Sequence, residues 1–418
     1  MNDNQEKFDV AVIGGGPAGI MAAGRAGELG AKVVLIEKNA DLGRKLLLTG
    51  KGRCNITKAE FDNQEFIKKL GKGGKFLSSA LFNFGPKEII NFFEERKLPI
   101  KIERGQRVFP ATDKSQDVLS VLQKYLKKNN VRILFKKNVL GFELEEGRIK
   151  NLRLKGEKIS AHFFIISTGG KSYPITGSRG EGYKWAKTLG HRIINPKPAL
   201  VPLEVKESWV KNMQGLSLKN VRINIWLDNQ KQDSRFGEML FTHFGLSGPI
   251  ILEVSKRIGA LLKNGTVTIE IDLKPGLDFS TLDKRLQRDF QNFSQKDFIN
   301  YLPSLVPKKL VSFILNFSGI PPRKKLNSIN KDERRKIIHL LKEMRVTVRN
   351  LLGFKEAIIT SGGVDLKEID SKTMRSKIIP NLFFAGEILD LDGPTGGYNL
   401  QICWSTGYAA GTYSASKN

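Results

Sequence analysis

The spacing of apolar residues predicts strands and helices in alternation at both ends of the chain. Residues 8–13 form a short apolar run with β-branched members, and an alanine-rich helical stretch follows and reaches residue 29. Further apolar runs cover 32–36, 163–168 and 382–385. Short buried strands that alternate with helices are typical of a parallel α/β sheet.

The middle of the chain has a different pattern. Residues 200–205, 220–227 and 266–273 alternate or run apolar and β-branched, which predicts a small antiparallel, β-barrel-like unit. From 279 to about 352 the apolar period is helical. The predicted domains are 1–195 with 354–418 for the nucleotide, a β-rich insertion at 196–278, and a basic helical subdomain at 279–353.

A glycine-rich turn follows the first strand and opens the first helix. Gly14 permits a tight turn, Gly16 lets the backbone approach a pyrophosphate, and Gly19 lets the helix pack closely on the sheet. Free N–H groups at the helix start would face the phosphates. Glu37 ends the second strand about twenty positions later, where a carboxylate accepts the ribose hydroxyls. The pattern predicts a Rossmann-type dinucleotide site.

Four further features favour FAD over NAD. Gly43 and Arg44 follow the acid at a spacing common in FAD enzymes of the two-dinucleotide-fold type, where this pair lines the ADP. The strand ending at Thr168 resembles the strand end that passes the adenosine in such enzymes. Glu387 takes the place of the acid that holds the ribityl chain or pyrophosphate. The glycine turn at 393–397 opens a small-residue helix, whose N–H groups would stabilise a reduced flavin.

These segments together resemble the bacterial aminoacetone-oxidase-like family of FAD-dependent oxidoreductases, which includes a bile-acid dehydro-steroid reductase and a ribosomal RNA dihydrouridine synthase. The matching stretches are residues 12–19, 49–57, 167–174, 240–249, 360–364 and 386–401. The resemblance implies a Rossmann-type FAD domain with an inserted β-barrel-like domain and a helical subdomain. The family has Gly-Gly-Gly-Arg-Cys-Asn where this chain has Lys51 as the second residue, a departure that adds a cation near the expected flavin.

The predicted FAD-binding residues are Gly14, Gly16, Pro17, Ala18, Gly19, Glu37, Lys38, Gly43, Arg44, Arg53, Asn55, Thr168, Gly169, Gly386, Glu387, Gly396, Gly397, Asn399 and Leu400. No second strand-linked glycine motif is present, so a dedicated NAD(P)H domain is not expected. A nicotinamide donor, NAD(P)H, would reach the flavin directly as a transient reductant.

Composition narrows the class of protein. Of the 418 residues, 40% are hydrophobic and 27% charged, as in a globular protein. No run approaches the ~18 apolar residues of a membrane span, and residues 1–7 lack the features of a secretory signal. Two cysteines, Cys54 and Cys403, and four scattered histidines suit neither disulfides nor a metal site. We expect a cytoplasmic protein with no metal.

The net charge of +27 is the unusual bulk property. Genome composition can produce a lysine-rich surface, and a polyanionic partner explains it equally well. Between 308 and 349, twelve Lys/Arg stand against three acids. This stretch is either a solvated helix face or a phosphate-binding surface suited to structured RNA, with no aromatic RNA-recognition signature. The cationic clusters are Arg323, Lys324, Lys325 and Arg334, Arg335, Lys336.

The activities named for the family share one reaction, the reduction of a C=C conjugated to a carbonyl. Hydride adds to the β carbon, which is C6 in uracil, and an acid protonates the α carbon. Cys54, His243 and Tyr398 are the candidate acids. The alternative role for Cys54 is to fill space behind the flavin ring, and the alternative role for His243 is a structural hydrogen bond. Cys403 is expected in the core.

Three functions remain open at this point. The first is an FAD-dependent reductase of uracil in large-subunit ribosomal RNA, with the base splayed into the flavin cleft and the basic insert holding phosphates. The second is a small-molecule reductase or oxidase of a steroid-like enone or an aminoacetone-type amine. The third is a non-catalytic, flavin-containing RNA-binding factor. The charge favours the first over the second.

Overall fold

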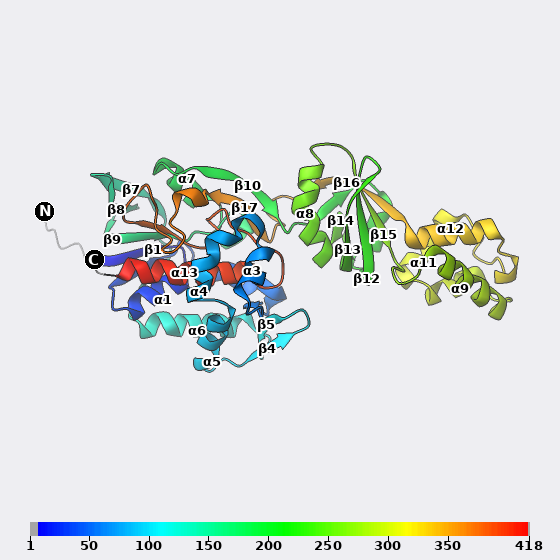
Figure 1. Cartoon of the computed structure of the whole chain (residues 1–418), viewed down its shortest axis with the longest axis horizontal. Coiled ribbons are helices and arrows are strands. Elements are labelled where there is room, and N and C mark those ends of the chain that lie inside the picture. The colour runs from blue at the N-terminus through cyan, green and yellow to red at the C-terminus, as the bar shows by residue number, and fades with distance from the viewer. Residues whose placement is uncertain (1–6, 417–418) are drawn as a thin grey trace. The chain divides into compact units, whose positions relative to one another are not determined.

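The computed structural model describes residues 7–416, which form two compact units (Figure 1). Unit 1 contains the residues up to Ala199 and those from Phe354 onward, and unit 2 is Leu200–Gly353. The chain leaves unit 1 after strand β10 (Ile193–Ala199) and returns just before β17 (Ile359–Val364). These two strands pair with each other in an antiparallel ladder, so the insertion begins and ends at one place in unit 1.

Unit 1 is built on a mainly parallel sheet. Strands β1 (Lys7–Ile13), β2 (Val33–Ile36), β6 (Arg132–Leu134), β9 (Lys158–Ile166) and β18 (Leu382–Phe384) lie in the order β6-β2-β1-β9-β18 and are all parallel. This is the strand order of a doubly wound dinucleotide-binding fold. The predicted Rossmann-type fold is confirmed.

The pairing of these strands brings the functional turns to one edge of the sheet. Ile13 pairs with Ile36 on one side and with Ile166 on the other, and Ile166 pairs with Phe384. Because parallel strands end at the same edge, the residues that follow these four lie in one row. The row contains Gly14, Glu37, Ser167 and Ala385.

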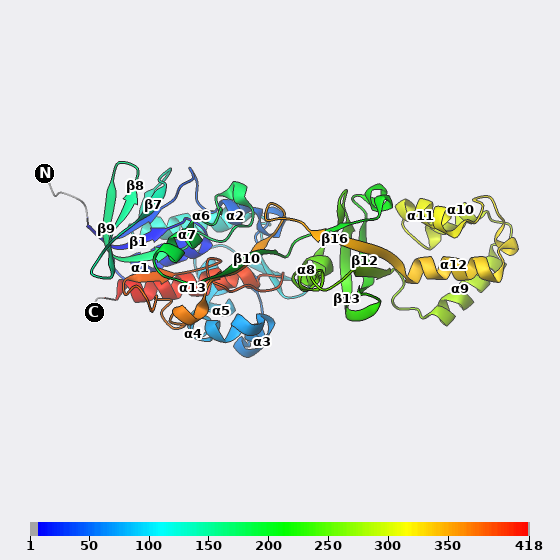
Figure 2. The same ribbon diagram turned by 90° about the horizontal axis from the view of Figure 1, so that it is seen from above.

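Helix α13 (Tyr398–Ala415) packs directly along helix α1 (Pro17–Glu28), as Figures 1 and 2 show. A Cβ on Gly407 would lie 2.4 Å from the carbonyl oxygen of Ala18. A Cβ on Gly411 would lie equally close, 2.4 Å, to the carbonyl oxygen of Ala22. Small residues on α13 therefore allow the two helix backbones to touch.

The other helices and strands of unit 1 cover the sheet or extend it. They are α2 (Arg44–Leu48), β3 (Thr57–Lys58), α3 (Asn63–Lys69), α4 (Ser78–Asn83), α5 (Pro86–Glu95), β4 (Ile100–Glu103), β5 (Arg107–Pro110), α6 (Ser115–Lys128), β7 (Val139–Glu145), β8 (Arg148–Leu154) and α7 (Glu181–Thr188). β7 and β8 join the main sheet antiparallel beside β9, and β3, β5 and β4 form a separate small sheet.

Unit 2 contains a closed antiparallel barrel with the strand order β11-β14-β13-β12-β15-β16. Its strands are β11 (Leu203–Val205), β12 (Ser217–Leu227), β13 (Gln230–Phe241), β14 (Gly245–Ser247), β15 (Val267–Asp272) and β16 (Met344–Leu351). Helix α8 (Pro249–Leu261) packs beside the barrel, where Ile250 lies 2.6 Å from the Cβ position of Gly237 on β13. The predicted β-barrel-like insertion is confirmed.

Four α-helices lie between barrel strands β15 and β16 in unit 2. They are α9 (Phe279–Asn292), α10 (Phe298–Tyr301), α11 (Lys308–Ser318) and α12 (Lys331–Lys342). Their apolar residues and those of the barrel form one continuous hydrophobic core. The prediction of a helical period as far as residue 352 is wrong at its end, because Met344–Leu351 is strand β16. In β16, Met344, Val346 and Val348 are buried, which is a period of two.

No helix within residues 7–416 is both long and apolar enough to cross a membrane. In the same part of the chain, no cluster of three or more His, Cys, Asp or Glu side chains could hold a metal ion.

The backbone contact between α1 and α13 generates the first prediction. Gly407→Val places a branched side chain against the Ala18 carbonyl, and overpacking of this kind costs about 1–3 kcal/mol. We expect the apparent midpoint of thermal unfolding to fall by several degrees. The control is Tyr413→Val, which puts the same residue at a position of α13 that is 39% exposed. Equal melting of the two variants would contradict the close packing.

Candidate functional site

The glycine turn between β1 and α1 has the geometry of a phosphate cradle. Gly14 has φ +104°, and a Cβ there would lie 2.7 Å from the Ser167 carbonyl oxygen. A Cβ on Gly19 would lie 1.9 Å from the Gly14 oxygen, whereas one on Gly16 would meet nothing within 4 Å. Gly14 and Gly19 are thus required by packing, and Gly16 borders open space. Pro17 is the first residue of α1, and no side chain caps this helix. The start of α1 can therefore receive an anion.

Glu37, which follows the end of strand β2, fixes the glycine turn through a hydrogen bond. Its side chain is only 7% exposed, and its Oε2 accepts a hydrogen bond from the Gly15 N–H at 2.7 Å. Its Oε1 accepts from the backbone N–H of Asn39 at 2.8 Å. Next to it, the Lys38 ammonium pairs with Glu181 on α7 at 2.5 Å. The predicted contact of Glu37 with a ribose stays a prediction.

Glu387 is the centre of a polar cluster at the same edge of the sheet. Its Oε2 accepts a hydrogen bond from Lys45 Nζ at 2.6 Å. Its Oε1 accepts from Ser172 Oγ and from the Thr360 N–H, each at 2.8 Å. Lys45 also donates to Ser172 Oγ at 2.6 Å. These four residues, which we call the Glu387 cluster, come from four segments that are far apart in sequence.

Sequence reasoning placed Glu387 in the site and missed Lys45. The Gly-Arg pattern drew attention to Arg44, whose guanidinium lies 3.5 Å from exposed Asp41. On the short helix α2, the side chain of Lys45 points about 100° away from that of Arg44 around the helix axis. Lys45 consequently reaches the Glu387 cluster, and its side chain is 20% exposed. The sequence signal that could have identified Lys45 is its position directly after the Gly43-Arg44 pair.

Cys54 lies in a strained loop and is fully buried. Its φ of +61° is unusual for a residue with a side chain, and its relative exposure is 0%. Burial raises the pKa of its thiol to about 12, against the opposing effect of a hydrogen bond with Thr49. The thiol is therefore protonated at neutral pH. This geometry favours Cys54 as a space-filling residue.

Arg53 points into an ionic cluster on the other side of that loop. Its Nη1 lies 2.8 Å from Glu103 and 3.2 Å from Asp113, and its guanidinium lies 4.0 Å from the centre of the Phe109 ring. The hydrogen bond from Arg53 lowers the pKa of Glu103. Arg53 thus anchors the loop, and its predicted role in binding FAD stays a prediction.

The start of α13 lies against the same loop. A Cβ on Gly397 would lie 2.3 Å from the Thr57 carbonyl carbon, and Gln401 accepts a hydrogen bond from Thr57 Oγ1 at 2.6 Å. Asn399 closes the preceding turn, since its Oδ1 accepts from the Gly393 N–H at 2.9 Å. Gly396 has φ +103° and nothing within 4 Å of its Cβ position. The turn therefore borders open space, as Gly16 does.

The three candidate acids lie in different settings. Tyr398, at the first position of α13, is 5% exposed and packs on Phe66 with ring centres 4.6 Å apart. His243 is exposed on the turn between β13 and β14 in unit 2, where its ring contacts Phe244. In unit 1, the loop of Cys54 and the helix of Tyr398 lie side by side, because Trp404 Nε1 donates to the Ile56 carbonyl at 2.9 Å.

The remaining predicted residues lie on the same turns. Gly43 has φ +65° before α2, Gly169 has φ +71° after β9, Gly386 has φ +80° after β18, Ala18 is buried in α1, and Leu400 is partly buried on α13.

Two buried polar atoms indicate that a ligand fits this edge. Asn55 Oδ1 and Thr168 Oγ1 are both shielded from solvent and have no hydrogen-bond partner in the described structure. Buried polar atoms are almost always paired, so two such atoms among the predicted FAD-binding residues call for a missing partner. With the open space at Gly16 and Gly396, they fit a bound dinucleotide. Asn55, Thr168 and the start of α1 would hold it.

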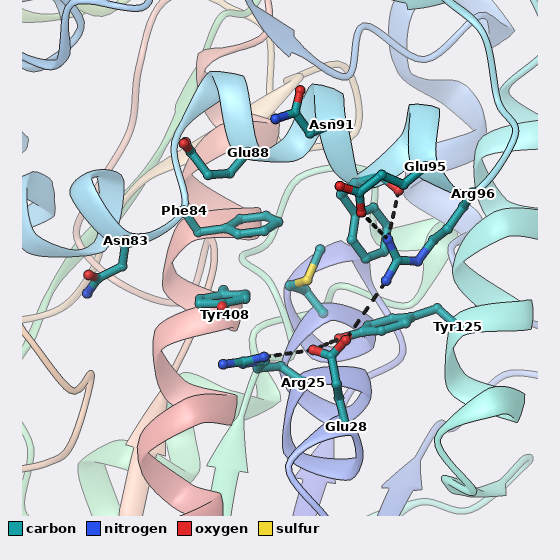
Figure 3. Close-up of a pocket in the computed structure, with 12 residues that line it drawn as sticks. Arg25, Glu28, Asn83, Phe84, Glu88, Asn91, Glu95, Arg96, Tyr125 and Tyr408 are labelled. Atoms are coloured by element: carbon teal, nitrogen blue, oxygen red, sulfur yellow. Dashed lines mark hydrogen bonds and ion pairs between the residues drawn. The ribbon is translucent and has the colours of Figure 1, made fainter.

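A separate pocket of about 300 Å³ lies among α1, α5, α6 and α13 (Figure 3). Arg25 and Glu28 line it from the last turn of α1, whereas the phosphate turn precedes the first. Their ion pair of 2.8 Å is joined by Tyr125, whose hydroxyl donates to Glu28 at 3.0 Å, and by Arg96 at 3.9 Å. The charged groups thus pair with one another and tie the helices together. This pocket is distinct from the candidate site.

The sheet and the phosphate turn define a dinucleotide-binding protein of the Rossmann class. The chain belongs to the family described as HI0933-like protein Rossmann domain, whose pattern matches residues 8–413. This assignment confirms the resemblance found in the sequence. The protein is therefore a member of a family of FAD-dependent oxidoreductases.

Two full-length relatives have named activities. A 3-dehydro-bile acid delta(4,6)-reductase of Clostridium scindens is 30% identical over 98% of this chain and 99% of its own length. A ribosomal RNA dihydrouridine synthase of Escherichia coli is 31% identical over 97% of each chain. The solved 3-ketosteroid-delta4-(5alpha)-dehydrogenase of Rhodococcus jostii is 14% identical, covers 99% of this chain and 98% of its own, and has a TM-score of 0.53. That likeness shows the fold alone.

The unpaired hydroxyl of Thr168 leads to a prediction about cofactor binding. Thr168→Val removes a buried hydroxyl that lacks a partner, so the FAD-free protein should be as stable as the wild type or more stable. A net hydrogen bond is worth about 1 kcal/mol, so FAD affinity should fall about fivefold. Flavin titration and thermal unfolding measure the two effects. Exposed Thr188→Val is the control, and unchanged FAD affinity in Thr168→Val would contradict the assignment.

The burial of Cys54 predicts slow alkylation in the native protein. In a Cys403→Ala background, iodoacetamide at pH 8 should label Cys54 far more slowly than in denaturant, because the raised pKa leaves almost no thiolate. The unfolded thiol titrates near its ordinary pKa of 9.0 and the folded one near 12. The contribution of this thiol to stability is therefore complete below pH 9 and is lost as the pH rises through 12. Fast native labelling would show a reactive thiol instead.

Proposed function

We propose that this protein is an FAD-dependent reductase of a C=C conjugated to a carbonyl, and that its substrate is uracil in large-subunit ribosomal RNA. The observation that carries the reaction is the agreement between two relatives with different substrates. A bile-acid delta(4,6)-reductase and a dihydrouridine synthase match this chain equally well over nearly its whole length. Both names describe the saturation of a C=C in conjugation with a carbonyl.

The charge of the chain favours RNA as the substrate. A net charge of +27 suits a polyphosphate and far exceeds what the single carboxylate of a bile acid would need. A small enone is the second candidate, favoured by the bile-acid reductase among the relatives. A non-catalytic RNA-binding factor would also explain the net charge, but it would not explain the cofactor site at the edge of the sheet.

Internal ion pairs occupy much of the basic helical insert. Four of the six cations in its two clusters pair with nearby acids, namely Lys324 with Glu333 at 2.6 Å, Lys325 with Asp297 at 2.9 Å, Arg334 with Asp283 at 2.6 Å and Arg335 with Asp332 at 3.6 Å. Arg323 and Lys336 have no ion-pair partner among residues 7–416. The insert therefore offers phosphates fewer free cations than its sequence suggests, and these two residues are its proposed RNA contacts.

In the proposed reaction, the side chains of the protein position the substrate and supply a proton. Bound FAD would provide the hydride, which adds to C6 of uracil, with NAD(P)H as the proposed source of electrons. The proton then goes to C5 from a side chain. The buried, protonated Cys54 has too high a pKa to donate efficiently near neutral pH. Tyr398, next to the glycine turn, and His243 on its exposed turn are the better candidates.

Mass-spectrometric mapping of ribosomal RNA from cells with and without the gene tests the proposal. We expect one uridine to lose its +2 Da modification when the gene is absent and to regain it with the wild-type gene. Gly16→Val should fail to restore it, because its side chain fills the open space of the phosphate turn. Gly276→Val, also at an open position, should restore it. An unchanged map would discard the RNA substrate and direct the search to conjugated enones.

A further inference from the structure

One face of the unit 2 barrel carries aromatic and basic side chains in cross-strand rows. Arg222 on β12 lies opposite Phe236 on β13, and both are exposed, Phe236 to 57%. Trp226 on β12 lies opposite Lys231 on β13. Directly opposite residues of an antiparallel pair share a face, and alternate residues of a strand do too. Ile223 and Ile225 between them are buried in the core, so this face is the outer one.

A polar ladder crosses four strands between the two aromatic side chains. Ser234 donates to Asn224 at 2.9 Å, and Asn224 donates to Glu270 at 3.1 Å. Arg345 on β16 completes the ladder, with its Nη2 2.7 Å and its Nε 2.9 Å from Glu270 Oε2. The two-point contact neutralises Glu270, whose side chain is 6% exposed. The ladder therefore presents little negative charge to a ligand.

Arg345 also extends the aromatic surface. Its guanidinium lies 5.7 Å from the centre of the Trp226 ring, and its side chain is 54% exposed. A guanidinium fixed by a carboxylate and close to an indole ring offers a planar group on which a base can stack. We call Arg222, Trp226, Lys231, Phe236 and Arg345 the barrel face.

We propose that the barrel face binds a single-stranded segment of RNA. Its bases would stack on Phe236 and on the Arg345–Trp226 pair, and its phosphates would contact Arg222 and Lys231. Arg222 and Lys231 have no ion-pair partner in the described part of the chain, which leaves both charges available to phosphates. Arg222 and Trp226 are four residues apart on one strand, or about 13 Å, so the two stacking surfaces would hold separate bases of one strand.

The composition of the face distinguishes RNA from a protein partner. Each of the two aromatic side chains, exposed Phe236 and partly exposed Trp226, has a cation directly opposite it, Arg222 for Phe236 and Lys231 for Trp226. Aromatic platforms interleaved with cations are the features by which proteins hold single strands. Protein interfaces depend instead on a continuous apolar centre with few charges.

The inference rests on the proposed RNA substrate. Binding measured without turnover tests the barrel face separately from the proposed reaction. The full FAD-loaded chain would be titrated into a short fluorescein-labelled single-stranded RNA of mixed sequence. Phe236→Ala should raise the Kd about tenfold through the loss of one stacked base. Phe236→Tyr keeps the ring and should bind as the wild type does. Arg222→Gln should weaken binding and lower the slope of log K against log salt by roughly 0.7.

Matched controls lie elsewhere in unit 2. Phe293→Ala removes an aromatic side chain that is 51% exposed beyond α9, and Lys284→Gln removes an exposed cation of α9. Phe293→Ala should change the Kd less than twofold, and Lys284→Gln less than Arg222→Gln does. Equal Kd values for wild type and Phe236→Ala would overturn the proposal and leave the face to a protein partner. Retained Phe236-dependent binding with an unchanged dihydrouridine map would instead refute the proposed reaction alone.

Discussion

Backbone contact around Ala18 is the constraint on which unit 1 depends. The Gly407 position touches the carbonyl of Ala18, and a Cβ on Gly386 would lie 2.7 Å from the Ala18 side chain. The start of α1 is therefore held between α13 and the turn after β18. Segments from the two ends of the chain meet there, which explains why the cofactor edge requires both parts of unit 1 and tolerates a long insertion between them.

The Glu387 cluster extends this constraint to the insertion. Thr360 belongs to β17, the strand by which the chain returns from unit 2, and its N–H donates to Glu387. Its Oγ1 also accepts from the N–H groups of Lys171 and Ser172 at 2.8 and 3.1 Å. The acid expected to face the cofactor is thus fixed by the same residues that anchor the returning strand. The ion pair with Lys45 at 2.6 Å offsets the cost of placing this carboxylate at a partly buried position.

The sequence predicted the parts of the structure that depend on local pattern. Short apolar strands, the glycine turn and the acid at the end of β2 follow rules of spacing, so the sheet and the phosphate turn were predictable. Strand β16 was missed because residues near it have a helical period, and the alternation of Met344, Val346 and Val348 spans only a few positions. A sequence window that covers both α12 and β16 contains two different apolar periods, so the short period of the strand is not detected.

Contacts between distant segments could not be predicted. Arg222 and Phe236 become neighbours only through the register of β12 and β13, so the sequence showed no aromatic signature for RNA. The cations at 324, 325, 334 and 335 looked available in a count of charges, yet the fold pairs each of them with an acid. Net charge thus showed poorly where free cations lie on the surface, and its indication of an RNA partner stays a prediction.

The transfer of electrons from the flavin to uracil is the central claim, and anaerobic reoxidation tests it most directly. The FAD-loaded protein would be reduced, freed of excess reductant and mixed with a ribosomal RNA fragment in a stopped-flow instrument. The account predicts that the RNA reoxidises the flavin and gains one dihydrouridine for each flavin oxidised, while the same fragment already carrying dihydrouridine has no effect. A flavin that stays reduced in the presence of the RNA and is reoxidised by a conjugated enone would contradict this account.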